Sequence, residues 1–424
     1  MITLLSSPSQ IVTVSTSGRN FKRGPEMQEV NVLEGCSLVL EDDIIKDIVP
    51  SSKIKPGSFQ NIISLEGKVI LPGLIDCHTH LAFAGSRADE FRQKLSGVSY
   101  EEIARSGGGI ARTVNAVRNA GFEELVKIAR PRIEYAITQG ITTLEIKSGY
   151  GLSTEDEIKL LRVINHLNTL YEIDIVPTFL GAHSFPAEYR SDKEGYLRLI
   201  NEKMLPEVAE HRLAKFCDAF LEKTAFSKEE VEVIFRKARD LGLSIKLHSE
   251  QFNAMGGVDL AIKYNATSLD HLEVIKETDI EKISATETVC VLLPGVSFFL
   301  DYGFAPARSL ISKGAIVSIS TDYNPGSSHI ANLNLVMSLA AIKMKMTIEE
   351  VISAVTINAA KALALSQETG SIEPGKKADL AVFDTTEYSD IVYQVGKNLN
   401  VMTIKNGRVI YTRNQPNFKE GLSL

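Results

Sequence analysis

Eight short apolar runs recur through the middle of the chain, and a segment with helical spacing of apolar residues follows each. The runs are rich in β-branched residues and nearly continuous in hydrophobicity, as in strands buried on both faces. Strands alternating with amphipathic helices predict parallel βα units, and eight such units fit a (β/α)₈ TIM barrel of the α/β class. A doubly wound open sheet would show the same alternation, and the count alone does not separate the two. The expected strands lie at 69–80, 141–151, 173–183, 213–223, 243–251, 266–273, 288–295 and 315–326.

The two ends of the chain have a different pattern. The first 65 or so residues form short alternating runs that Gly and Pro interrupt, which is typical of a small sheet domain. The C-terminal end is similar, and its Asn406-Gly407 pair is a strong hairpin signal. We therefore predict a small β-sandwich domain built from residues 1–66 and 368–424, with the barrel between them at 67–367.

Composition narrows the class of protein. A chain of 424 residues can hold one large barrel and a satellite domain. The net charge of −7 comes without a basic run, so we expect neither nucleic acid nor an anionic membrane as partner. Four scattered cysteines without C-x-x-C spacing indicate a reducing compartment, and no signal-like N-terminus or long apolar run is present, so the expected location is the cytoplasm. A homodimer is the default expectation for an enzyme of this size.

Polar residues gather at the C-terminal ends of the apolar runs. In a barrel these ends converge on one rim, where active sites are built. Five of the eight histidines would meet there, namely His78, His80, His183, His248 and His271.

The H-x-H pair at the end of the first run indicates a metal site. Alternate residues of a strand point the same way, so His78 and His80 would both face the barrel mouth. A third imidazole from His248 and the carboxylate of Asp322 complete a set suited to Zn²⁺ or Fe²⁺, and an open position for water would make it hydrolytic. An isolated H-x-H can equally be a surface pair, so this interpretation depends on the histidines at the other strand ends.

Two segments carry a resemblance to a known family. PGLIDCHTHLAFAG is similar to the first-strand signature of the amidohydrolase superfamily, and GSIEPGKKADLAVFD to the segment with which its members re-enter their small β domain. HLAFAGSRADEF, SGGGIARTV, EIKSGYGL, FLGAHSFP, LHSEQFNAMGG and STDYNPGS resemble the imidazolonepropionase family within it. The resemblance implies hydrolysis of the ring amide of 4-imidazolone-5-propanoate to N-formimidoyl-L-glutamate in histidine degradation.

The same resemblance implies roles for individual residues. One divalent metal ion, Zn or Fe, would be held by His78, His80, His248 and Asp322. The implied catalytic residues are Asp322, His271 and His183. The implied substrate contacts are Arg87, Tyr150, His183, Gln251, Asn324, Gly326 and Ser327.

Physical chemistry agrees with several of these roles. A carboxylate tail on the substrate suits the planar guanidinium of Arg87, which can donate two parallel hydrogen bonds. Asp322 would take the proton of the attacking metal-bound water and return it to the departing ring nitrogen. His183 or His271 would polarise the ring carbonyl, and Tyr150 would orient the ring or the tail. The N-P-G-S run after Asp322 would otherwise be read as an ordinary turn.

Three features depart from related patterns. Gln251 stands where some relatives carry a proton-shuttling glutamate, and Glu250 would point the opposite way, so proton transfer falls on Asp322 and His271. That argues against purine or cytosine deaminase chemistry. Lys223 lies beyond the fourth strand, which favours one metal over a pair bridged by a carboxylated lysine. The glycine-rich segment 106–110 lacks a phosphate-loop ending, and we expect a lid or a flexible connection.

Two other functions compete with this interpretation. One is another ring-opening or deaminating amidohydrolase with a small carboxylate-bearing cyclic substrate. The other is an inactive metal-binding barrel that serves as a scaffold, which an intact water-activating set disfavours.

Overall fold

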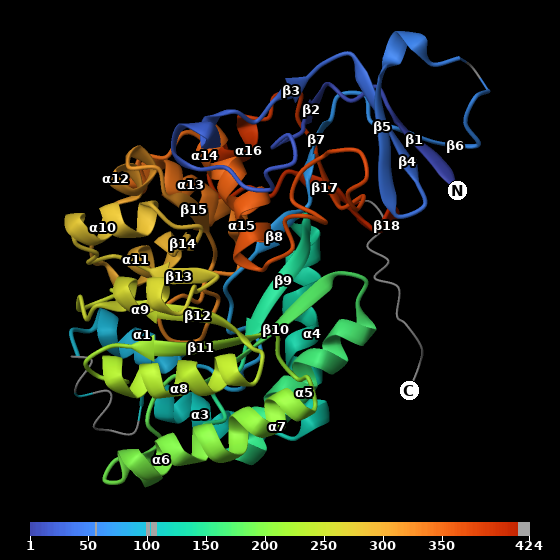
Figure 1. The fold of residues 1–424 in the computed structure, drawn as a ribbon. Coiled ribbons are helices and arrows are strands. Elements are labelled where there is room, and N and C mark those ends of the chain that lie inside the picture. The colour runs from blue at the N-terminus through green and yellow to red at the C-terminus, as the bar shows by residue number, and fades with distance from the viewer. Residues whose placement is uncertain (56, 99–101, 103–107, 414–424) are drawn as a thin grey trace.

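The predicted barrel is present in the computed structural model, which describes residues 1–55, 57–98, 102 and 108–413. Its eight strands follow one another in chain order, and each pairs in parallel with the next (Figure 1). The first and last strands meet at the rim, where Thr79 pairs with Tyr323 and Asp322 N donates to His78 O at 3.0 Å. This closure confirms the barrel over the open sheet. The strands are β8 (Leu74–Asp76), β9 (Ile141–Lys147), β10 (Asp174–Ala182), β11 (Phe216–Leu221), β12 (Ser244–Ser249), β13 (Ser268–His271), β14 (Val289–Leu292) and β15 (Ile316–Ile319).

Helices surround the barrel, and their sequences explain where they start and which face they bury. Helix α8 begins at a capping box formed by Ser227 and Glu230. Its buried residues follow the spacing of one helical face, and they are Val231, Ile234, Phe235 and Ala238. The helices are α1 (Ala88–Leu95), α3 (Ile110–Asn119), α4 (Phe122–Thr138), α5 (Thr154–Leu170), α6 (Lys193–Leu199), α7 (Leu205–Glu210), α8 (Lys228–Asp240), α9 (Gly257–Lys263), α10 (Glu277–Ser284), α11 (Pro294–Leu300), α12 (Ala307–Ser312), α13 (Leu333–Met344), α14 (Ile348–Val355), α15 (Ile357–Ala362) and α16 (Asp390–Tyr393).

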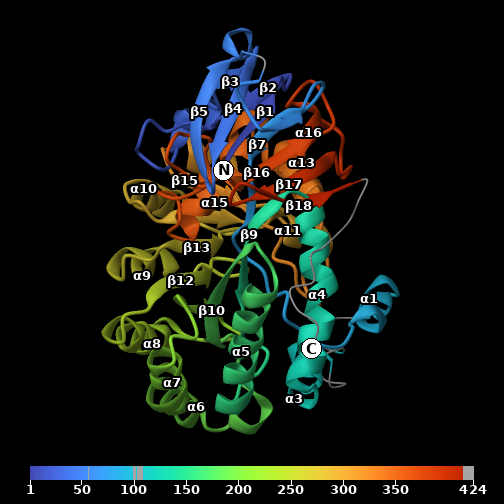
Figure 2. The same ribbon diagram turned by 90° about the vertical axis from the view of Figure 1, so that its right-hand side faces the viewer.

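A separate pair of sheets forms at one end of the molecule from strands of both chain termini (Figure 2). Their facing apolar residues, among them Leu5, Leu38 and Leu380, share one core. The four-stranded sheet contains β5 (Ile44–Pro50), β4 (Cys36–Glu41), β1 (Ile2–Ser6) and β6 (Asn61–Ser64). The six-stranded sheet contains β18 (Arg408–Thr412), β17 (Asn400–Lys405), β16 (Leu380–Phe383), β7 (Val69–Pro72), β2 (Gln10–Val12) and β3 (Val32–Leu33).

The first expected barrel strand, 69–80, is divided between the two parts of the molecule. Strand β7 pairs with β16 and β2 in the six-stranded sheet, and only β8 enters the barrel. Gly73 lies between them, and a side chain there would collide with Thr142 at 2.2 Å. Residues 69–72 and 74–75 are all apolar on the two sides of Gly73, so hydrophobicity alone could not show the break. The domain limits 1–66, 67–367 and 368–424 stay predictions.

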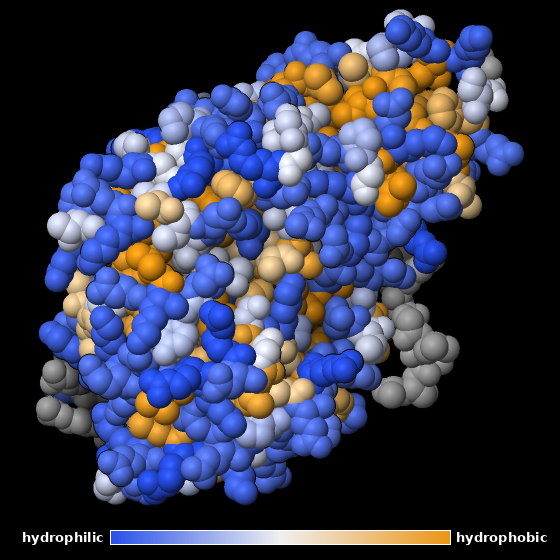
Figure 3. All heavy atoms as spheres, in the orientation of Figure 1, coloured by the Kyte–Doolittle hydropathy of each residue, from blue (hydrophilic) through white to orange (hydrophobic). Residues whose placement is uncertain are grey.

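The surface is mostly hydrophilic on the face shown in Figure 3, with apolar residues gathered over the small sheets. Exposed residues of that sheet region include Met1, Ile2 and Ile62. Within the described ranges, no helix combines the length and the apolar character that a membrane span requires.

Candidate active site and metal centre

Four side chains from three barrel strand ends bring their polar atoms together at the rim. Asp322 Oδ1 lies 3.5 Å from His78 Nε2 and 3.4 Å from His80 Nε2. His248 Nε2 lies 3.4 Å from His80 Nε2. Ligands of a tetrahedral ion at bond lengths of about 2.0–2.1 Å lie roughly 3.3–3.4 Å from one another. These three separations are close to that spacing, and the ligand atoms of His78, His80 and Asp322 all lie within 4.8 Å of one another.

The protonation and bonding of this cluster also fit a cation. Burial lowers the pKa values of His78 and His80 well below their usual range, which keeps the imidazoles neutral with lone pairs free. Among the described residues, His78 Nε2 and Asp322 Oδ1 are buried without a hydrogen-bond partner. Buried polar atoms without a partner are rare unless an ion or water completes them. The residues present therefore fit a metal ion.

Carboxylates on neighbouring strands hold the outer nitrogens of two of these histidines. Asp270 Oδ2 lies 2.6 Å from His78 Nδ1, and Asp218 Oδ2 lies 3.0 Å from His248 Nδ1. Asp270 accepts the Nδ1 hydrogen of His78, so the Nε2 lone pair of that ring is left for a metal, while Asp218 lies close enough to His248 Nδ1 for an electrostatic contact. Asp218 belongs to β11 and Asp270 to β13, so the barrel itself sets the orientation of both rings.

A buried lysine lies between these two carboxylates. Lys147 Nζ is 2.8 Å from Asp218 Oδ2, 3.1 Å from Glu145 Oε1 and 3.7 Å from Asp270 Oδ2. Burial by itself would lower the pKa of Lys147, but Asp218, Glu145 and Asp270 raise it above its usual value, so the ammonium stays charged. Lys246 Nζ adds a second cation, at 2.7 Å from Glu145 Oε2. The interior of the barrel beneath the histidines is thus an ion network rather than an apolar core.

The backbone around Asp322 places its carboxylate in the cluster. Asp322 has a φ of +48°, an unusual conformation that aspartate tolerates better than most residues. Asp76, at the end of β8, accepts hydrogen bonds from Thr321 N at 3.1 Å and Thr321 Oγ1 at 2.7 Å, and also from Ser320 Oγ. The first and eighth strands are thereby joined directly below the site. Burial raises the pKa of Asp322 to about 7, against the opposing influence of His271.

Arg87 lies against the loop that follows Asp322. Its Nε donates to Glu90 Oε2 at 2.8 Å, and Glu90 also accepts from Gly109 N at 3.2 Å. A Cβ on Gly326 would come within 2.1 Å of Arg87 Nη1. Gly326 therefore provides the space in which the guanidinium lies beside the site.

Tyr150 and His183 form one wall next to His80. The ring of His183 stacks on that of His80 with centroids 5.1 Å apart, and Tyr150 lies 5.8 Å from His80. Glu157 accepts from the backbone of Gly149 at 3.0 Å and thereby fixes the loop that carries Tyr150. Gly149 has a φ of +99°, and a side chain there would meet His183 Nδ1 at 3.0 Å, so the close approach needs glycine.

Asn324 uses its side chain within its own loop. Its Oδ1 accepts from the backbone nitrogens of Gly326 and Ser327, each at 2.8 Å. Its Nδ2 donates to Asp322 O at 2.7 Å and to Ser327 Oγ at 2.9 Å. The geometry supports a role in shaping this loop, and the predicted contacts of Asn324 and Ser327 with substrate stay predictions.

The side chains of Glu250 and Gln251, which follow β12, have different neighbours. Glu250 turns to the helix side, where its Oε1 accepts from Gly257 N at 2.8 Å at the start of α9. Gln251 is buried, and its Nε2 donates to Tyr302 OH at 3.3 Å. Glu250 therefore cannot replace the glutamate that some relatives carry at the position of Gln251.

His271 lies beside the cluster and has an acidic neighbour that the sequence analysis did not single out. One ring nitrogen of His271 lies within 4.8 Å of nitrogens of His78 and His248. Its Nδ1 lies 3.5 Å from Glu273 Oε1. Burial tends to lower the pKa of His271, but Glu273 raises it above the ordinary value.

The network residues Asp218, Glu145, Glu273 and Tyr302 had no assigned role from sequence. Asp218 and Glu145 lie inside fully or largely buried barrel strands, and a charged residue within such a strand is a signal that could have identified them. Tyr302 follows α11 and is distant in sequence from every other member, so no local pattern marks it.

Two further sequence predictions fall outside the cluster. Lys223 lies in an exposed turn beyond β11, and its backbone nitrogen donates to Glu222 Oε1 at 2.8 Å. Of the glycine-rich segment 106–110, residues 106 and 107 lie outside the described residues, while Gly109 is the N-cap residue directly before helix α3.

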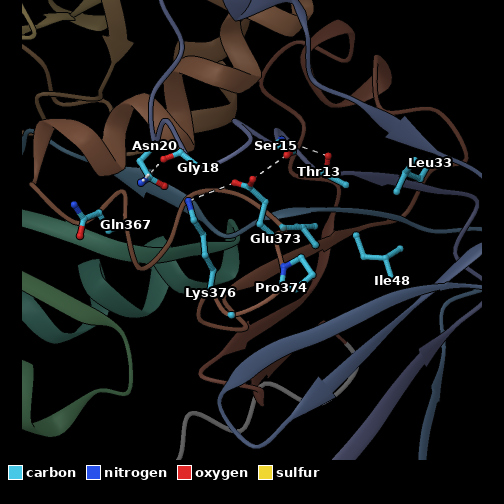
Figure 4. A pocket seen from close by; sticks show the side chains of 12 residues that line it. Thr13, Ser15, Gly18, Asn20, Leu33, Ile48, Gln367, Glu373, Pro374 and Lys376 are labelled. Carbon is cyan, nitrogen blue, oxygen red and sulfur yellow. Dashed lines mark hydrogen bonds and ion pairs between the residues drawn. The ribbon is translucent and has the colours of Figure 1, made fainter.

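A cavity of about 630 Å³ lies elsewhere, at the junction of the small domain with the segment after α15 (Figure 4). Its charged groups are already paired: Glu373 accepts from Ser15 Oγ at 2.9 Å, and Lys376 Nζ lies 3.6 Å from Glu373. Among the described residues its lining contains no histidine, so the chemistry belongs to the barrel rim. The lining consists of Thr13, Ser15, Gly18, Asn20, Leu33, Ile48, Gln367, Ile372, Glu373, Pro374, Gly375 and Lys376.

The fold and this site define a class of protein. Residues 69–410 match the model of the amidohydrolase family. Solved structures with the same fold include a triazine hydrolase variant, with a TM-score of 0.75 at 15% identity over 98% of this chain and 96% of that one. Another is a zinc-bound adenosine deaminase from Xanthomonas campestris, with a TM-score of 0.70 at 17% identity over 97% and 93% of the two chains. The class is that of amidohydrolases, which agrees with a metal cofactor at this site.

Curated relatives narrow the class. The imidazolonepropionase of Flavobacterium johnsoniae is 42% identical over 97% of this chain and 100% of its own length. That of Clostridium tetani is 42% identical over 97% and 98% of the two chains, and that of Alkaliphilus oremlandii is 44% identical over 95% and 96%. The chain therefore belongs to the imidazolonepropionase family of amidohydrolases.

Proposed function

We propose that this protein hydrolyses the ring amide of 4-imidazolone-5-propanoate and releases N-formimidoyl-L-glutamate. The observation that carries the proposal is the position of Arg87, whose guanidinium lies against Gly326, four residues beyond Asp322. A substrate with a propionate tail can then bind its carboxylate to Arg87 while its ring lies at the histidine cluster. The relatives of this chain that bear the name imidazolonepropionase support the same substrate.

We infer that His78, His80, His248 and Asp322 hold one divalent metal ion, as their spacing supports. When bound, such an ion supplies Lewis acidity and makes a coordinated water easier to deprotonate. Zinc and iron both suit three imidazoles and a carboxylate, and measured metal content of the purified protein would distinguish them.

The proton chemistry falls on Asp322. In the reaction a water oxygen adds to the ring carbonyl carbon, the bond from that carbon to the ring nitrogen breaks, and the nitrogen takes up a proton. Asp322 is the carboxylate within reach of this centre that can accept the water's proton and deliver it to the nitrogen. Glu250 is turned away from the site, and Gln251 cannot transfer protons.

The two remaining histidines differ in what they can donate. His183 Nδ1 lies 2.9 Å from Gly149 O, a pure acceptor, so this nitrogen carries the hydrogen. Burial lowers the pKa of His183 to about 4, so the ring is neutral and presents an acceptor at Nε2. His183 therefore has no hydrogen at Nε2 to donate to the ring carbonyl, and polarisation of the carbonyl falls to His271, which Glu273 supports.

The direct test is turnover by metal-replete protein incubated with 4-imidazolone-5-propanoate, followed by loss of ring absorbance and by identification of the product. We expect N-formimidoyl-glutamate and a requirement for the metal. Protein that retains its metal and binds the propanoate without turnover would instead support the scaffold alternative. Faster turnover of another cyclic carboxylate would favour a different ring-opening amidohydrolase.

Replacing Arg87 with alanine should mainly weaken substrate binding. Loss of a charge-assisted, two-pronged hydrogen bond to a carboxylate costs about 1.5–3 kcal/mol, so KM should rise roughly 10- to 100-fold with a smaller change in kcat. Steady-state kinetics on the propanoate measure both constants. Arg92→Ala is the matched control, because Arg92 lies on helix α1, which begins directly after Arg87, is largely exposed and pairs with Asp89 at the surface. An unchanged KM in Arg87→Ala would remove the clamp assignment.

We also expect the protein to form a homodimer in the cytoplasm, on the sequence argument alone. Sedimentation of the purified enzyme would test the first expectation.

A further inference from the structure

Gln251 belongs to a chain of hydrogen bonds that ends on a buried carboxylate. Gln251 Nε2 lies 3.3 Å from Tyr302 OH, and Tyr302 OH lies 3.2 Å from Glu273 Oε1. His271 Nδ1 approaches the same oxygen at 3.5 Å. The side chain of Glu273 is only 1% exposed, so these groups replace water around its charge.

The chemistry of the groups decides which of them donates in each of these hydrogen bonds. A carboxylate only accepts, so the hydroxyl of Tyr302 donates its hydrogen to Glu273. The oxygen of Tyr302 then accepts, and the group of Gln251 that faces it is the amide nitrogen. The carbonyl oxygen of Gln251 is left as an acceptor, and within the described part of the chain nothing donates to it. The orientation of a side-chain amide is often ambiguous, but that of Gln251 follows from the Glu273 carboxylate at the end of this series of hydrogen bonds.

The backbone holds these residues in one unit. His271 and Leu272 have φ values of +85° and +72°, which non-glycine residues adopt only where the surrounding structure enforces them. Leu272 N donates to Ser249 O at 3.2 Å, and Val274 N donates to Glu250 O at 2.8 Å. The turn that carries His271 and Glu273 is therefore tied to the end of β12, immediately before Gln251.

We propose that Glu273 is a positioning residue for ring opening, which fixes Gln251 as a hydrogen-bond acceptor for the N–H of the ring amide and holds the ring of His271. The inference rests on the proposed function and adds to it the substrate feature that Gln251 recognises. Gln251 then replaces the missing glutamate as an acceptor, while the negative charge of this part of the site comes from Glu273.

The test compares two substrates in the wild type and in Glu273→Gln. The substrates are 4-imidazolone-5-propanoate and its analogue methylated at the ring amide nitrogen, which cannot donate to Gln251. In Glu273→Gln the new amide can donate as well as accept, so Tyr302 and Gln251 are free to reverse. We expect the preference for the parent substrate, as a ratio of kcat/KM values, to fall about 10-fold, with kcat on the parent also lowered and metal content unchanged.

A second variant and a control separate positioning from damage to the fold. Tyr302→Phe leaves the His271–Glu273 pair in place and removes only the hydroxyl, and it should also lower the preference for the parent substrate. Glu250→Gln is the matched control, because it neutralises a neighbouring buried carboxylate whose contact is with Gly257; its preference should equal that of the wild type.

The outcomes are distinct. A wild-type protein that does not open the parent ring contradicts the proposed function itself. A wild type that turns over while Glu273→Gln and Tyr302→Phe keep the wild-type preference overturns the positioning role. If Glu273→Gln loses its metal or fails to fold, the preference of Tyr302→Phe decides the question alone.

Discussion

Asp322→Asn should reduce kcat by about 10²- to 10⁴-fold, the range expected when a group that transfers protons in the transition state is lost. Asparagine has the same shape and tolerates the same φ of +48°, so the backbone at the end of β15 should not change. The amide can offer an oxygen to a metal but cannot carry a proton from water to the departing nitrogen. Three imidazoles remain for the metal, so we expect metal content to fall less than activity. The measurement is kcat on the propanoate together with metal content of the same preparation.

Asp301→Asn provides the control for this substitution. Asp301 also has a positive φ, of +57°, but it lies in the exposed turn after α11, outside the cluster. It should therefore keep wild-type kinetics and metal content. An Asp322→Asn protein with full metal content and more than about a tenth of wild-type kcat would refute the proton role of Asp322.

Lys147→Met should be among the most destabilising single substitutions in the barrel and should weaken metal binding as well. Removing one partner from a buried ion network leaves an uncompensated charge, which costs about 3–5 kcal/mol of unfolding free energy. Asp218 and Asp270 lose their shared cation, so their hold on His248 and His78 weakens. Loss of such supporting groups typically lowers metal affinity about 10- to 100-fold. Urea unfolding and competition with a chelator measure the two effects separately.

Lys246→Met tests whether the effect on the metal is specific. Lys246 is equally buried, but its Nζ bonds to Glu145 Oε2 at 2.7 Å and Cys77 O at 2.9 Å, and not to Asp218 or Asp270. We expect a comparable loss of stability with metal affinity close to that of the wild type. Equal losses of affinity in both variants would mean that the network stabilises the barrel without orienting the histidines.

Much of the site followed from the sequence because its members share one rule. His78, His80, His248 and Asp322 lie at or just beyond the C-terminal ends of barrel strands, and these ends meet at one rim whatever their separation in sequence. The structure brings all four together. Arg87 lies seven residues beyond His80 in a connection, and its place beside Gly326 depends on two loops that no periodicity describes.

The break between β7 and β8 shows the limit of reading hydrophobic runs. Residues 69–72 and 74–75 are all apolar, yet the first segment pairs with β16 and the second belongs to β8, which pairs with β9. Pairing partners are chosen by contacts over hundreds of residues, and a local pattern contains no information about them. The change from one sheet to the other occurs at Gly73, where Thr142 from another strand lies so close that a side chain would collide with it.

The sequence by itself determined the parallel βα units, the two-ended sheet domain and the convergence of the histidines, because periodicity and strand direction are local properties with a fixed geometric consequence. The closure of the eight strands into a barrel was decided by the structure. Only the tertiary structure decided which nitrogen of His78 carries the hydrogen, since that depends on Asp270 from another strand. The structure also decided which side-chain atom of Gln251 donates and which accepts, because the Glu273 carboxylate acts on Gln251 only through the hydroxyl of Tyr302. Hydrogen-bond direction is a property of neighbours in space, and the fold alone supplies those neighbours.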